Sequence, residues 1–234
     1  RQRQMCIRDS AIAALALLIV NKIALETDLP QGLGALIAIG ACLVIGWVNG
    51  FIVVKLRVNS FIATLGMSQV VAAIIRNIHD GGQINGELSK TYRSFGKGDI
   101  FAFDWPGTGS EIALPWYFLY GLIITVIVYY ILEHTPTGRH MFATGGNPEA
   151  ARLSGINTDR LTWGSLVGSA ALAGFAGLVY SWKVGIYTTS FGAPLLFPAV
   201  AAVFFGASQL RGRPNVWGTV IAVYTLAFGI KGIG

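Results

Sequence analysis

Charged residues are scarce in this chain. Asp, Glu, Lys and Arg make up 12% of its 234 residues, whereas hydrophobic residues make up 53%. Soluble domains carry about 25% charged residues, and the mean hydropathy here is +0.60. The composition therefore argues against a soluble domain and favours a membrane protein. The net charge of +6 does not indicate nucleic-acid binding, because the basic residues stand at the ends of apolar segments and form no single face.

Residues that carry enzyme or metal chemistry are equally few. The two cysteines, Cys6 and Cys42, give neither a disulfide framework nor a metal-ligand spacing. The histidines show no HExxH spacing, and the GxSxG and CxxC patterns are absent. The stretch "GTGS" is too short for a phosphate loop and lacks its Lys. We therefore expect no enzyme activity, no cofactor and no metal site in this chain.

The apolar segments also lack ionisable side chains at their centres. Ionisable residues stand at segment ends instead: Lys22, Arg76, Glu133 and His134. Carriers driven by protons or sodium often place such groups at mid-membrane, where their cost makes them functional, so this absence weakens an ion-coupled mechanism. Three polar residues are candidates for a substrate pathway, although a hydrogen bond between helices explains each equally well: Asn49, Thr64 and Gln69.

Long apolar runs dominate the rest of the chain. A membrane-spanning helix needs about 20 mostly apolar residues, and seven segments are candidates: Ala11–Leu25, Gly32–Leu56, Ser60–Asn77, Pro115–Glu133, Leu161–Trp182, Leu195–Ser208 and Val216–Ile230. The Leu195 segment is short and contains Pro198, so we expect it to be tilted, broken or re-entrant. These patterns predict an all-α, polytopic membrane helix bundle with six to seven membrane segments.

Residues 1–10, "RQRQMCIRDS", differ from the rest of the chain, because they are polar and lack periodicity. We expect them to be a non-native or disordered leader. Residues 11–234 are then expected to form a single transmembrane domain, and the apolar run at the C-terminus suggests a fragment of a longer protein.

Loop charges orient the predicted segments. With a cytoplasmic N-terminus and one crossing per segment, three basic groups fall inside: Lys55 and Arg57; Arg139, Arg152 and Arg160; Arg211 and Arg213. This agrees with the positive-inside rule. The loop 78–114 is then extracytoplasmic and the loop 135–160 is cytoplasmic.

Two segments carry a small residue at every fourth position. One series is Gly34, Ala38, Cys42, Gly46 and Gly50, and the other is Ser165, Ser169, Ala173 and Gly177. Small side chains let membrane helices approach closely. Both series therefore predict interfaces within a tight bundle.

The cytoplasmic loop contains the signals of a short helix. Asn147 is a good N-cap, Pro148 suits the first helical position, and Glu149 lies where the helix dipole favours an anion. Gly155 supplies the left-handed residue that ends the helix. Two turns are marginal alone in water, so this helix either docks on a partner or caps its own bundle, with Ala150, Leu153 and Ser154 on a small face.

Three separated motifs carry a family resemblance. They are "VNGFIVVKLRVNSFIATLGM", "GRHMFATGGNPEAARLSGIN" and "FPAVAAVFFGASQLRGRPNVWGTVIA". In this order they resemble the permease subunits of bacterial ABC sugar importers of the ribose/xylose-type branch. The likeness extends from about Gly32 to the end of the chain.

The resemblance implies an inner-membrane subunit that forms a homodimer and works by alternating access. Two ATP-binding subunits would dock inside, where they would bind the ATP, and a periplasmic or lipid-anchored sugar-binding protein would dock outside. The family's coupling helix maps onto residues 147–155: Asn147, Pro148, Glu149, Ala150, Ala151, Arg152, Leu153, Ser154 and Gly155.

Two other hypotheses remain open. An autonomous secondary carrier or channel for a small polar solute would need no ATPase. A membrane scaffold would contain no pathway at all. The sequence does not name the sugar.

Overall fold

The computed structural model describes residues 6–26, 30–78, 83–85, 98–104, 111–188, 192–209 and 215–233. The described helices are α1 (Cys6–Glu26), α2 (Gln31–Val54), α3 (Ser60–Ile78), α5 (Trp116–His134), α6 (Pro136–Gly146), α7 (Pro148–Leu153), α8 (Thr158–Val184), α9 (Gly192–Gln209) and α10 (Val216–Ile233). Each of the seven predicted apolar segments is a helix, so the all-α prediction is confirmed. Four of them are long and apolar enough to cross a membrane on their own: α2, α3, α5 and α8.

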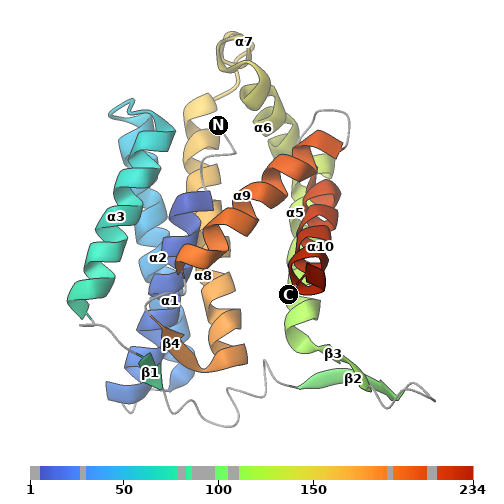
Figure 1. Cartoon of the computed structure of the whole chain (residues 1–234). Coiled ribbons are helices and arrows are strands. Elements are labelled where there is room, and N and C mark those ends of the chain that lie inside the picture. The colour runs from blue at the N-terminus through green and yellow to red at the C-terminus, as the bar shows by residue number, and fades with distance from the viewer. Residues whose placement is uncertain are drawn as a thin grey trace.

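Two short antiparallel ribbons interrupt the helical order, and the sequence did not predict them. Strand β1 (Gln83–Asn85) pairs with β4 (Ile186–Thr188), in the register Ile84 opposite Tyr187. Strand β2 (Asp99–Asp104) pairs with β3 (Glu111–Pro115). Figure 1 shows all four strands at one end of the molecule and α7 at the other. We call these the strand end and the α7 end.

Helices α1, α2, α3 and α8 form the main bundle. The most extensive helix pairings are α2 with α8 and α1 with α8. Helix α1 lies at the centre, because its apolar residues belong to both buried clusters of the core. It begins at Cys6, five residues before the predicted boundary at Ala11. Residues 1–5 lie outside the described residues, and a non-native origin of the leader stays a prediction.

The small-residue series on α2 lies at helix contacts within the bundle, as predicted, and its Gly46 and Gly50 pack against α8. A Cβ atom added to Gly46 would lie 2.6 Å from the Cβ of Ala170, and one added to Gly50 would lie 2.3 Å from the Trp163 ring. In the series on α8, Ser169 and Gly177 contact α1. A Cβ on Gly177 would lie 2.4 Å from the Ala13 carbonyl oxygen, and the Ser169 hydroxyl donates to Asp9. Helix α8 therefore uses different small residues for its two neighbours.

Helices α5, α9 and α10 lie beside the main bundle. In Figure 1, α9 crosses obliquely from α1 to α10, and α5 runs alongside α10. Pro198 stands inside α9, which is a single unbroken helix of 18 residues. Of the tilted, broken or re-entrant forms expected for this segment, the structure has an unbroken helix that runs obliquely to its neighbours. Ring contacts join α5 to α10: the ring centroids are 6.5 Å apart for Phe118 and Tyr224, and 5.8 Å apart for Tyr129 and Trp217.

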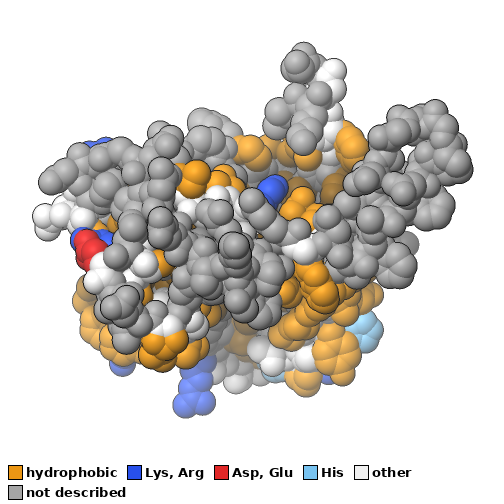
Figure 2. All heavy atoms as spheres, turned by 90° about the horizontal axis from the view of Figure 1, so that it is seen from below, with side chains coloured by type: hydrophobic (Ala, Val, Ile, Leu, Met, Phe, Trp, Pro, Cys, Tyr) orange, Lys and Arg blue, Asp and Glu red, His pale blue; other side chains and the backbone are white. Residues whose placement is uncertain are grey.

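The surface agrees with a membrane environment. Helix α5 is described throughout, and none of its residues is buried, although it is strongly apolar. Figure 2, which views the molecule from the strand end, shows that hydrophobic side chains prevail among the described ones and that charged ones are few. Such an exposed apolar surface is stable only in lipid or against other membrane helices.

Candidate functional site

Helix α7 forms the tip of the α7 end, and its first turn is capped as predicted. The Asn147 side-chain oxygen accepts hydrogen bonds from the backbone N–H groups of Glu149 and Ala150, both at 3.1 Å. Pro148 occupies the first helical position, and Glu149 and Arg152 lie in the first and last turns, where the helix dipole favours their charges. Asn147 thus satisfies two N–H groups that the start of a helix leaves without partners.

The C-terminus of α7 ends in a Schellman motif. Gly155 has a φ of +80°, in the left-handed region that glycine adopts without steric cost. The N–H of Ile156 donates to the Ala151 carbonyl, and the N–H of Gly155 donates to the Arg152 carbonyl, both at 3.1 Å. Only residues 154–157 lie between α7 and α8, and Asn157 caps α8 by accepting from the Arg160 N–H at 3.1 Å. Both ends of the short helix are therefore fixed by local hydrogen bonds.

The two faces of α7 differ sharply in burial. Ala151 is 5% exposed and points toward the molecule, whereas Leu153 is 90% exposed. The predicted face of Ala150, Leu153 and Ser154 is indeed solvent-accessible throughout. An exposed leucine on a fixed helix tip is costly in water. Leu153 is therefore accessible to a molecule outside the chain.

Helix α6 holds α7 in place, and the sequence analysis missed it by treating 135–160 as a loop. Thr135 caps α6 by accepting from the Gly138 N–H at 3.3 Å, and Pro136 is its first residue. These two residues were the signal that could have found it. The segment contains weak helix formers, among them the two glycines at its C-terminus, so its composition did not indicate a helix. A Cβ added to Gly138 would lie 2.0 Å from the Leu132 carbonyl oxygen, so the α5–α6 corner requires glycine.

The three candidate pathway residues do not share one surface. Asn49 is fully buried, and neither polar atom of its side chain has a hydrogen-bond partner among the described residues. Thr64 is also fully buried, but its hydroxyl donates to carbonyls of its own helix, those of Ser60 and Phe61. Gln69 is exposed and lies five residues further along α3, about 140° around the helix from Thr64. Only Asn49 combines burial with unused hydrogen-bonding capacity.

Comparisons with known proteins all find permeases of transport systems. A family profile described as "Branched-chain amino acid transport system / permease component" matches residues 10–231. The ribose import permease protein of Escherichia coli K12 is 29% identical over 225 residues, which cover 96% of this chain and 67% of that protein. The galactose/methyl galactoside import permease protein of Haemophilus influenzae is 32% identical over 206 residues, or 86% of this chain and 56% of that protein.

The fructose import permease protein of Rhizobium meliloti is 25% identical over 236 residues, which cover 95% of this chain and 62% of that protein. The chain thus spans between about half and two thirds of the length of these relatives. No solved structure matches the chain.

Proposed function

This chain belongs to the transport-system permease family whose profile matches it, and we propose that it is the membrane subunit of an ATP-driven importer for a monosaccharide. The observation that carries this proposal is α7: a doubly capped helix tip that exposes Leu153 by 90%. The substrate class is supported by the names of the relatives, which are import permeases for ribose, galactose and fructose.

The α7 end is the proposed docking site of the partner ATPase. Residues Asn147–Gly155 form the coupling element, and Leu153 inserts into an apolar groove of the ATP-binding subunit, as an exposed anchor on a helix does in groove recognition. ATP is bound by that partner. A sugar-binding protein docks at the strand end, and two copies of the permease form the complete pathway.

The proposed orientation places the α7 end in the cytoplasm. Lys55 and Arg57 in the turn between α2 and α3, together with Arg139, Arg152 and Arg160, all belong to segments at this end. An excess of Lys and Arg in short loops marks the cytoplasmic side. Arg211 and Arg213, which the sequence also assigned to this side, lie outside the described residues.

Motion of the ATPase enters the membrane through α7 along two short connections. One runs through α6 and the close Gly138 corner into α5, and the other runs through the capped Asn157 junction into α8. Because both junctions are fixed, a displacement of α7 moves α5 and α8 as rigid bodies. Helix α8 belongs to the main bundle and α5 lies beside it, so their movement relative to each other opens the pathway toward one face and then the other.

A substrate pathway through the bundle includes Asn49 in this proposal. Its unpartnered amide can exchange hydrogen bonds with a sugar hydroxyl, and a buried amide without partners is unfavourable when nothing is bound. Thr64 and Gln69 contribute less, since the first bonds to its own helix and the second points elsewhere.

The test is ATP-dependent sugar uptake. The permease is reconstituted in vesicles with its ATP-binding subunit and sugar-binding protein, and uptake of radiolabelled ribose, galactose and fructose is measured with and without ATP. We expect uptake of at least one sugar that requires both ATP and the ATPase. Uptake by the permease alone would instead support an autonomous carrier, and no uptake of any sugar would reject the sugar assignment.

A further inference from the structure

An open-sided cavity of about 400 Å³ lies between α5 and α8, in the half of the molecule near the strand end. Its walls come from the first three turns of α5 and the last three turns of α8, and the residues that matter here are Tyr117, Tyr120, Ile124, Leu172, Phe175 and Lys183. A water molecule fills only about 30 Å³. The cavity is therefore large enough for a substantial organic group, and it belongs to neither the coupling helix nor the Asn49 region.

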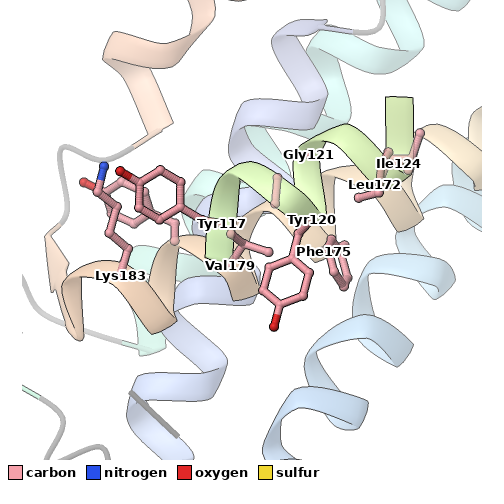
Figure 3. A pocket seen from close by; sticks show the side chains of 10 residues that line it. Tyr117, Tyr120, Gly121, Ile124, Leu172, Phe175, Val179 and Lys183 are labelled. Atoms are coloured by element: carbon pink, nitrogen blue, oxygen red, sulfur yellow. The ribbon is translucent and has the colours of Figure 1, made fainter. Parts of the chain in front are cut away.

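The lining changes character along the helices. Figure 3 shows Lys183 and Tyr117 together at one end, Tyr120 and Phe175 in the middle, and Ile124 and Leu172 at the other end. Lys183 and Tyr117 are one residue from the ends of α8 and α5 at the strand end. The polar end of the cavity thus faces the membrane surface, and the aliphatic end faces the membrane interior.

The polar end offers a positive charge that no described residue neutralises. The Lys183 ammonium lies 4.6 Å from the centre of the Tyr117 ring, and it makes no ion pair with any residue that the structure describes. An ammonium over an aromatic ring is held in place by the ring quadrupole but keeps its charge. It can therefore attract an anion at the level of the membrane surface.

The rings of Tyr120 and Phe175 line the middle of the cavity, and both also contact Trp182, which is not part of the lining. The Tyr120 ring meets Phe175 and Trp182 edge to face, with centroid distances of 6.5 and 5.5 Å. Phe175 and Trp182 are themselves perpendicular at 6.2 Å. Trp and Tyr gather where a membrane protein meets the headgroup level, and Tyr117 beside Lys183 fits that depth at the polar end.

The length of the cavity fits one leaflet. From Leu172 to Lys183 the helix rises about 16 Å at 1.5 Å per residue, and half of a bilayer's hydrocarbon core is about 15 Å. A monosaccharide fits these walls poorly, because its many hydroxyl groups would meet chiefly apolar side chains and lose their hydrogen bonds.

We propose that this cavity binds an anionic phospholipid from the leaflet at the strand end, with the phosphate at Lys183 and one acyl chain between α5 and α8. The lipid fills a gap that side chains leave open, because α5 buries none of its own residues against the bundle. It thereby ties α5 to α8 while still letting the two helices slide past each other.

Lipid preference of the purified permease tests the proposal. The protein is placed in nanodiscs or mixed micelles containing phosphatidylglycerol or phosphatidylcholine, and bound lipid is counted by native mass spectrometry. The wild type should retain phosphatidylglycerol in preference to phosphatidylcholine. Lys183→Met keeps the length of the side chain but removes its charge, and should reduce this preference about fivefold. Lys22→Met is the matched control, since Lys22 lies at the same end but pairs with Glu26 at 3.6 Å, and should leave the preference unchanged.

A second variant tests the acyl-chain site separately from the charge. Val179→Trp fills the middle of the cavity and should abolish retention of both lipids, whereas Tyr130→Trp, on the exposed far end of α5, should not. Equal retention of both lipids by the wild type overturns the proposal. A Lys22→Met variant that loses as much of the preference for phosphatidylglycerol as Lys183→Met also overturns it. A Val179→Trp variant that keeps its lipid overturns it as well, because the lipid would then bind elsewhere while another helix or a second copy covers the cavity. Displacement of the bound lipid by ribose, galactose or fructose would show a sugar site instead.

Discussion

Single glycines set how closely neighbouring helices approach in this chain, and Gly138 is the clearest case. Its missing side chain lets α6 turn back against the last carbonyl groups of α5, where a Cβ atom would lie only 2.0 Å from the Leu132 oxygen. Gly155 acts differently, because there the backbone conformation itself, with φ at +80°, excludes most other residues. One glycine is required by space and the other by conformation.

Gly138→Ala should therefore destabilise the α5–α6 corner. Overpacking of this kind costs about 1–3 kcal/mol, so we expect a lower unfolding temperature of the detergent-solubilised protein and weaker binding of the ATPase. Gly145→Ala, on the same helix, is the control, because a Cβ there meets nothing within 4 Å. It should be neutral or slightly stabilising, since alanine favours helix over glycine. Equal unfolding temperatures for both variants would refute the close approach at Gly138.

At the scale of helices, apolar runs and capping residues predicted where helices form and where one of them ends. The seven apolar segments are all helices, and Asn147 and Gly155 bound α7 as the capping pattern indicated. Pairings between distant segments were not predictable in this way. The β1–β4 ribbon joins residues about a hundred positions apart through only three residue pairs, and no short pattern records it. The face that α7 turns inward was also unpredictable in detail, because six residues are too few for a period to show that Ala151 is the buried one.

The α2–α8 interface gives a prediction at the same scale. Gly46→Leu should force these helices apart, since even a Cβ at this position would lie 2.6 Å from Ala170, and the expected loss is about 3 kcal/mol. Gly40→Leu places the same side chain on the same helix in open space. Thermal unfolding in detergent should separate the two variants clearly. If Gly40→Leu is as damaging as Gly46→Leu, the small-residue series does not form the interface.

For the whole molecule, the sequence predicted the class and a candidate docking helix, while the pathway needed the structure. Asn49, Thr64 and Gln69 looked alike as polar residues in apolar runs, yet only Asn49 is both buried and unpartnered among the described residues. The cavity between α5 and α8 escaped notice for a physical reason: its aromatic residues have the same spacing as ordinary lipid-facing ones. Its character comes from two helices that are separated in sequence by α6 and α7.

The orientation of the molecule has a direct test. In a variant whose native cysteines are replaced by alanine, Ser154→Cys should react with a membrane-impermeant thiol reagent only when the cytoplasmic side is accessible. Glu26→Cys lies at the strand end, where the native side chain is 65% exposed, and should show the opposite pattern. Labelling of Ser154→Cys in intact cells would reverse the assigned topology.

We propose that an ATPase acts on this permease at α7, and a substitution of Leu153 tests this proposal. Leu153→Asp puts a charge on a side chain that is 90% exposed, so it should leave folding and membrane insertion intact. Leu153→Met conserves size and hydrophobicity and serves as the matched variant. The measurement is co-purification of the ATP-binding subunit with each permease. We predict that Leu153→Asp loses the ATPase while Leu153→Met retains it. Full retention by Leu153→Asp would show that the ATPase does not dock on α7.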